Sequence, residues 1–193
     1  MIPSGSTAIG AAVLALLLAA APASAAITIL GGGLGRGCYE AAEFNRETRF
    51  SLELCTRALN EEALSRRDRA ATHVNRGIIY MRARDLAAAL ADYDRALAID
   101  PGLGEAHVNR GIALLHMGGR DVEAVDAFTR GLALKPSRPE IAYYSRAVAN
   151  ELLGNVRAAY EDYQAAASAR PGWEEPVEQL KRFSVERRPM ERG

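Results

Sequence analysis

The residue types best suited to chemistry in this chain are its three histidines, His73, His107 and His116, and its two cysteines, Cys38 and Cys55. His73 and His107 begin two copies of the same word, HVNRGI, so one interpretation is a metal ion held between adjacent helices. No third ligand accompanies them, and we prefer a packing role for both side chains. HExxH, GxSxG and paired CxxC motifs are absent, and neither cysteine has a histidine nearby in sequence. We therefore predict no catalytic residue, no metal site and no cofactor, and an enzyme remains the minority hypothesis.

Composition and charge narrow the choice of partner. Lysine and arginine together count 24, and so do aspartate and glutamate, so no overall field attracts nucleic acid or an anionic membrane. The acidic pair Asp92 and Asp94 lacks the glycine and the spacing of a calcium loop, which favours a solvated helix face. Residues 31–37, GGGLGRG, fit neither a dinucleotide fingerprint nor a phosphate loop. We expect no nucleic-acid partner and no small-molecule substrate.

The N-terminal segment predicts export. Residues 1–35 carry no charged side chain, residues 8–21 are apolar throughout, and APASAA supplies small residues at Ala23 and Ala25. We predict a signal peptide that is cut after Ala25 and delivers the protein to the periplasm or the medium. The alternative is an uncleaved anchor of about 23 residues extended through ITIL, which would give membrane contact.

From Cys38 onward the sequence predicts an all-α protein built from repeats. Apolar residues recur at helical spacing, and glycine and proline interrupt them at regular intervals. HVNRG at His73 returns at His107 and, degraded to YYSRA, at Tyr143. A second block recurs every 35 residues as Ala89-Tyr93-Ala96-Pro101, Ala124-Phe128-Gly131-Pro136 and Ala159-Tyr163-Ala166-Pro171.

A period near 34 residues, with a glycine in the first helix, an alanine and aromatic stripe in the second and a closing proline, resembles the tetratricopeptide repeat family. The resemblance covers residues 70–173 and departs from the family pattern at His73 and His107, where tryptophan is usual, and at Ala147, where glycine is usual. It implies a right-handed α-solenoid in which Gly77 and Gly111 permit close helix approach and the prolines end each second helix.

The repeats divide the chain into predicted segments. A helix over residues 174–188, with Val177, Leu180 and Phe183 on one side, is expected to cap the solenoid. The segments are a signal peptide 1–25, a flexible glycine-rich spacer 26–37, an incomplete first repeat 38–69, full repeats 70–103, 104–139 and 140–173, the capping helix 174–188 and a disordered tail 189–193.

The resemblance also implies a concave groove lined by the first helices, where a partner peptide binds. The predicted groove residues are Val74, Asn75, Ile78, Met81, Val108, Asn109, Ile112, Leu115, Tyr144 and Val148. Asparagines at such positions bind the backbone of an extended peptide in similar proteins, and an amide suits this because it both donates and accepts. The same apolar face also packs between repeats, so part of it is expected to be core.

Two further features follow from aligning the repeats. Arg76, Arg110 and Arg146 can form a basic ladder for a carboxylate ligand, although we favour local pairing with acids such as Asp92, Asp126, Glu161 and Asp162. Cys38 and Cys55 align with positions that face each other across a helix pair, so we predict a disulfide in an oxidising compartment. The alternative is two small buried cysteines that never meet.

Taken together, these features predict a non-catalytic adaptor, periplasmic or secreted, that binds a protein or peptide partner in its groove. The competing hypothesis is a homo-oligomeric spacer, or a membrane-anchored scaffold, that uses the apolar face for self-association. Carboxylate-binding members of the family hold a peptide C-terminus with lysines, and the groove predicted here has none, so heat-shock-type clients are not implied.

Overall fold

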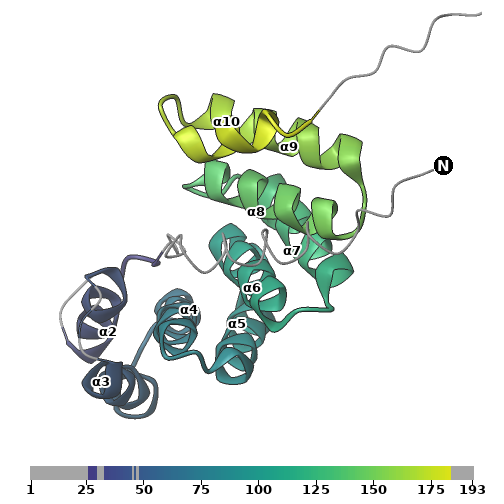
Figure 1. The fold of residues 1–193 in the computed structure, drawn as a ribbon. Helices are drawn as coiled ribbons and strands as arrows, with labels where there is room; N and C mark the ends of the chain where they lie inside the picture. Colours follow the sequence, from purple (N-terminus) through teal and green to yellow (C-terminus); the bar gives the residue numbers. More distant parts are fainter. Residues whose placement is uncertain (1–25, 30–32, 45, 47, 184–193) are drawn as a thin grey trace, which may run out of the picture.

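The computed structural model describes residues 26–29, 33–44, 46 and 48–183 of the chain. Within these ranges every regular element is an α-helix (Figure 1). The helices are α2 (Leu34–Glu43), α3 (Thr48–Glu61), α4 (Arg66–Arg82), α5 (Leu86–Ile99), α6 (Gly104–Met117), α7 (Asp121–Ala133), α8 (Pro139–Leu152), α9 (Val156–Ala169) and α10 (Glu174–Leu180). The predicted signal peptide and the predicted tail 189–193 lie outside the described residues.

The helices pack as antiparallel pairs, α2 with α3, α4 with α5, α6 with α7 and α8 with α9. The glycine and aromatic positions of the repeat explain this closeness. A Cβ added at Gly77 would lie 2.5 Å from Tyr93 Cε1, and one at Gly111 would lie 2.7 Å from Phe128 Cε1. Only glycine therefore allows the ring of the second helix to lie against the backbone of the first. The all-α solenoid predicted from the sequence is confirmed.

Polar side chains cap the N-termini of α4 and α5, and tight turns join the helices. The Ser65 hydroxyl accepts from the Asp68 backbone N–H at 3.1 Å, and the Asp85 carboxylate accepts from the Ala88 N–H at 3.0 Å. The turns after α4 and α8 have a positive φ at equivalent positions, 63° at Arg84 and 75° at Gly154. Helices α4 and α8 therefore end through a left-handed residue, which is arginine after α4 and glycine after α8.

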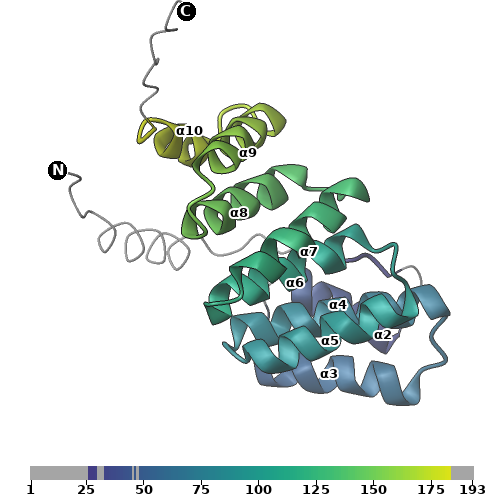
Figure 2. The same cartoon turned by 90° about the vertical axis from the view of Figure 1, so that its right-hand side faces the viewer.

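Successive pairs stack with a consistent curvature (Figures 1 and 2). The first helices pack on one another, α4 against α6 and α6 against α8, more closely than the second helices α5, α7 and α9 do. The stack therefore bends toward the side of the first helices. We call the surface formed by α4, α6 and α8 on that side the inner face.

The buried apolar residues form two clusters. The larger cluster runs from α2 to α8 and contains the disulfide cysteines and the ring of Phe128. The smaller cluster consists of Ala147, Val148, Ala159 and Tyr163, with Leu180 and Phe183 packed against it. Helix α8 contributes to both clusters, so it is the element that joins the C-terminal cap to the rest of the solenoid.

The structure differs from two predicted segment boundaries. Helix α2 begins at Leu34, inside the segment 26–37 that the glycine content suggested was a flexible spacer, and residues 26–29 lie against α4. The capping helix ends at Leu180 rather than at residue 188, and residues 184–188 lie outside the described part of the chain. Among the described helices, none combines the length and apolar character needed to cross a membrane.

Candidate protein-interaction surface

The apolar residues predicted to line an open groove lie mostly in the interior. The exposed fraction is at most 6% for each of Val74, Ile78, Met81, Val108, Ile112, Leu115 and Val148. The reason is that the first helices pack side by side, so these side chains fill the space between repeats. Tyr144 is half-buried and is part of the C-terminal cap. The centroid of its ring lies 5.4 Å from that of Tyr163 and 5.0 Å from that of Trp173.

Asn75 contacts a stretch of backbone that lies outside the helices. Its Oδ1 accepts from the Ile27 N–H at 2.8 Å, and its Nδ2 donates to the Ile27 carbonyl at 2.9 Å. The Asn75 side chain is fully buried, and Asn109, one repeat later, is 2% exposed. The predicted role of the asparagine, to hold peptide backbone, is therefore performed here within the chain.

The segment bound by Asn75 consists of Ala26–Ile29, and its side chains alternate like those of a strand. Ile27 packs against the main core and Ile29 is 2% exposed, whereas Thr28 between them is exposed. A Cβ at Gly35 would lie 3.6 Å from Ile29 Cδ1, so the Ile29 side chain lies beside the start of α2. The sequence analysis did not identify Ile27 and Ile29, although alternation in AITI was a signal that could have found them.

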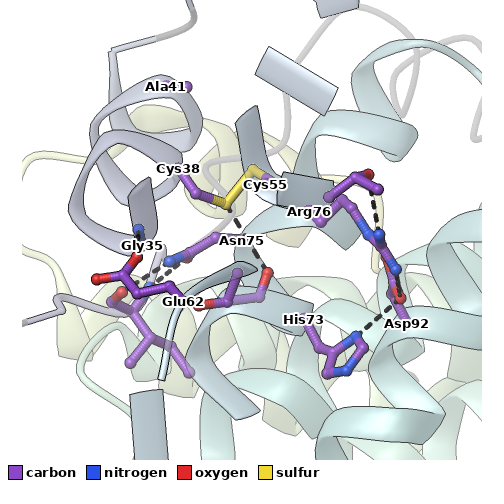
Figure 3. Close-up of a disulfide and its surroundings, with 12 residues drawn as sticks. Gly35, Cys38, Ala41, Cys55, Glu62, His73, Asn75, Arg76 and Asp92 are labelled. Atoms are coloured by element: carbon purple, nitrogen blue, oxygen red, sulfur yellow. Dashed lines mark hydrogen bonds and ion pairs between the residues drawn. A yellow bond between two sulfur atoms is a disulfide. The ribbon is translucent and has the colours of Figure 1, made fainter. Parts of the chain in front are cut away.

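The N-terminus of α2 is fixed independently of this segment (Figure 3). Glu62 Oε2 accepts from the Gly35 backbone N–H at 2.7 Å, which places a carboxylate at the positive end of the helix dipole. Gly33 has a φ of +96°, and a Cβ there would lie 2.5 Å from Glu62 Oε1. The carboxylate can reach the helix end because Gly33 has no side chain.

Cys38 and Cys55 form a disulfide that joins α2 to α3 (Figure 3). The two residues are 17 positions apart and both are fully buried. The bond closes the first helix pair, which has few large apolar side chains of its own. It therefore fixes α2 to α3 by covalent chemistry where apolar packing is weakest.

Asp92 on α5 is a fully buried carboxylate that collects several donors (Figure 3). Arg76 Nε and Nη2 donate to its two oxygens at 2.7 and 2.8 Å, and His73 Nδ1 lies 3.0 Å from Oδ1. Burial by itself raises the pKa of Asp92, but the hydrogen bonds from Arg76 and His73 outweigh it and hold the pKa at about 2. The carboxylate therefore stays ionised inside the protein.

The other two ladder arginines are also engaged. Arg146 forms the same two-pronged pair with Asp162, at 2.9 and 2.7 Å. Arg110 differs, because its Nε donates at 2.7 Å to Asp94 of the preceding helix, while Asp126, 16 positions after Arg110, stays exposed; the position equivalent to Asp92 and Asp162 in this repeat is Ala127. The three arginines join helices within the solenoid, as the preferred interpretation predicted, and the sequence misplaced only the partner of Arg110.

The remaining histidine contacts do not converge. His107 Nε2 lies 3.1 Å from the Pro101 carbonyl, beside a surface cavity of about 420 Å³ that Arg110, Arg130 and Glu123 also line. Burial lowers the pKa of His107, and the same cause lowers that of His116. Within the described residues, no three histidine, cysteine, aspartate or glutamate side chains gather as a metal site.

The repeated glycine and aromatic contacts and the curved stack define a helical-repeat protein. Residues 70–103 match the family model described as Tetratricopeptide repeat. This part of the chain is a tetratricopeptide repeat (TPR), and the fold of the described chain is similar to that of solved TPR structures, as the sequence pattern predicted.

Similar proteins support the same assignment. Over 92 residues the chain is 33% identical to mouse serine/threonine-protein phosphatase 5. The aligned region makes up 48% of this chain and only 18% of the phosphatase. The crystal structure of MamA has a TM-score of 0.63 at 20% identity and covers 78% of this chain and 82% of its own. The first TPR of Spaghetti (RPAP3), bound to the HSP90 peptide SRMEEVD, has a TM-score of 0.56 at 21% identity. The match covers 58% of this chain and 88% of the RPAP3 chain. These structural likenesses concern the fold, which is typical of non-catalytic interaction modules.

Proposed function

We propose that this protein is a non-catalytic adaptor that binds an extended segment of a partner protein along its inner face. The observation that carries the proposal is the contact between both amide atoms of Asn75 and the backbone of Ile27. A side chain that holds one extended backbone segment through its N–H and its carbonyl is suited to hold another. Asn109 occupies the same position in the next repeat, so a longer segment can be followed from one repeat to the next.

The partner segment is uncharged in this proposal. The HSP90 peptide bound to the RPAP3 repeat ends in Glu-Glu-Val-Asp, and such a ligand needs cations that are not already paired. Arg76, Arg110 and Arg146 are paired with aspartates of this chain. Asn75 and Asn109 lie instead among aliphatic residues that are buried between the repeats, so the proposal assigns recognition of the partner to its backbone and its apolar side chains.

The proposed setting is the periplasm or the extracellular medium, after removal of residues 1–25. The disulfide supports it, because buried disulfides persist in oxidising compartments and are uncommon in the cytosol. Mass spectrometry of the N-terminus should find Ala26 in the soluble envelope fraction. A chain that still begins at Met1 and sediments with membranes would establish the anchored alternative.

The function is tested by comparing partner capture with folding. Wild-type protein and the double variant Asn75→Ala, Asn109→Ala should be used as baits in an envelope extract, with Asp126→Ala on the outer helix α7 as the matched control. We expect a captured protein that the control retains and the double variant loses, while the double variant keeps a cooperative thermal melt. Retention by the double variant would place the binding surface elsewhere.

Self-association is the second candidate function, and one observation favours it. Phe44 and Phe50, on either side of the connection between α2 and α3, are 66% and 61% exposed. Exposed aromatic side chains of this kind mark contact surfaces more often than scattered aliphatic ones do. Light scattering after size-exclusion chromatography should give a dimer that Phe44→Ser, Phe50→Ser converts to a monomer if this alternative holds.

A further inference from the structure

The occupied state of the inner face indicates what kind of peptide fits it. Ala26–Ile29 lies outside any helix and against α4, with the Ile27 N–H and carbonyl both bound by Asn75. Ile27 and Ile29 turn toward the protein and Thr28 turns away. Backbone hydrogen bonds combined with alternate buried side chains are how extended peptides are recognised by proteins that accept them as ligands.

The segment is attached to the solenoid separately from α2. The disulfide to Cys55 and the hydrogen bond from Gly35 N–H to Glu62 both hold α2, and neither of these two bonds involves residues 26–29. Between the two lies the sequence Leu30-Gly31-Gly32-Gly33, which contains three glycines. The segment can therefore leave the inner face while α2 and the helix pairs stay folded.

The contacts that hold the segment are few and uncharged. Asn75 supplies two neutral hydrogen bonds, Ala26 and Ile27 pack against the main apolar cluster, and Ile29 is buried. Because the segment is tethered, its effective concentration at the site is in the millimolar range, which compensates for a weak intrinsic affinity. A partner peptide with more contacts along α4 and α6 can compete with it.

We propose that Ala26–Ile29 is a built-in competitor that occupies the partner site, and that the partner segment it imitates is an extended, uncharged peptide of the form Ile-Xaa-Ile. This inference rests on the proposed function and adds the ligand class and its regulation. Binding of a partner then requires release of the segment, so the apparent affinity is lower than the affinity of the open site.

The test uses a labelled synthetic peptide with the sequence AITIL, which is the chain's own segment supplied in trans. Ile27→Asp introduces a carboxylate at a side chain that packs on the core, and it should release the tethered segment. Thr28→Asp is the matched control, because it makes the same change one residue later at an exposed side chain. Fluorescence anisotropy should show the peptide binding to the Ile27→Asp protein on the order of tenfold more tightly than to the wild type or to the control. Adding Asn75→Ala should remove that gain.

Three outcomes decide the matter. Equal peptide affinity for the wild type and Ile27→Asp would overturn the proposal, and so would a gain that persists in the Asn75→Ala background. If Ile27→Asp fails to fold, Ile27→Pro replaces it, since proline removes the backbone donor and the isoleucine side chain without adding a charge. The capture experiment separates this proposal from the proposed function. If the double variant Asn75→Ala, Asn109→Ala loses the captured partner but Ile27→Asp shows no gain in peptide binding, the built-in competitor is refuted and the proposed function stands.

Discussion

Replacing Asp92 by asparagine tests how far buried charge pairs hold the repeats together. The substitution keeps the shape of the side chain, but it removes the charge and leaves one carbonyl acceptor where two carboxylate oxygens accepted from Arg76 and His73. The Arg76 side chain is only 13% exposed, so in the variant its positive charge stays buried without the negative charge of Asp92 to balance it. Removing one partner of a buried pair costs about 3–5 kcal/mol.

The expected cost is somewhat smaller. Arg76 Nη1 also donates to Thr56 Oγ1 at 3.0 Å, and that contact survives. The third donor, Arg95, is 57% exposed and contributes little because water screens it. We therefore expect Asp92→Asn to lower the free energy of unfolding by about 2–3 kcal/mol and the Tm by about 5–10 °C.

The chain supplies its own controls for this experiment. Asp126 follows Arg110 at the same 16-residue spacing that separates Asp92 from Arg76, but it is exposed, so Asp126→Asn should change stability by less than about 0.5 kcal/mol. Asp162, paired with Arg146, should resemble Asp92. Thermal and urea unfolding followed by circular dichroism provide the measurement. Similar melting of the Asp92 and Asp126 variants would refute the reasoning.

The pH dependence gives the second readout of the same variant. The pKa of Asp92 is lowered from 3.8 to about 2 on folding, so the ionised carboxylate stabilises the protein fully above pH 3.8. That contribution, about 2 kcal/mol, is lost as the pH falls from 3.8 toward 2. The stability gap between wild type and Asp92→Asn should therefore be constant from pH 7 to pH 5 and shrink below pH 4. A gap that does not change with pH would assign the effect to packing instead.

Four further variants have defined outcomes. Tyr93→Phe should leave the free energy of unfolding unchanged or raise it by up to about 1 kcal/mol, because the buried Tyr93 hydroxyl has no hydrogen-bond partner among the described residues. Tyr163→Phe should lower the free energy of unfolding by about 1 kcal/mol, since the Tyr163 hydroxyl donates to Glu151. Urea unfolding of both variants measures this difference, and equal effects would contradict the prediction. Arg84→Gly should be neutral or stabilising by up to about 1 kcal/mol, because Arg84 has a φ of 63° and glycine adopts that conformation freely, and a lower Tm would count against this. Replacing both disulfide cysteines by serine should cost about 3 kcal/mol, and alkylation of the folded, unreduced protein should detect no free thiol.

The repeat architecture was predictable because it depends on contacts that recur at fixed spacing. Gly77 and Tyr93 meet within one helix pair, and the same spacing brings Gly111 to Phe128. Each copy of the pattern therefore predicts the same contact between a glycine of the first helix and an aromatic ring of the second helix. Sequence comparison of the chain with itself was enough to identify the helices, their pairing and the glycines that allow it.

The candidate site was less predictable because its contacts cross between distant parts of the chain. Ile27 and Asn75 are 48 positions apart, and nothing in the repeat pattern connects them. The glycines after the segment suggested a spacer, although the spacing of Ile27 and Ile29 suits burial on one side of a strand. Arg110 has acidic residues 16 positions away in both directions, and only the packed structure distinguishes Asp94 from Asp126.

Division of the core into two clusters means that the protein does not unfold as one unit. The α9 and α10 helices contribute to the small cluster, whereas α8 contributes to both, so opening of the last two helices leaves the main cluster intact. Amide protons of α9 and α10 are expected to exchange with solvent through this partial opening, with a lower free energy than those of α4 and α6. At the other end, the Cys38–Cys55 bond ties α2 to α3. Under oxidising conditions the solenoid therefore frays from its C-terminal end, and reduction adds a second site of fraying at the N-terminal end.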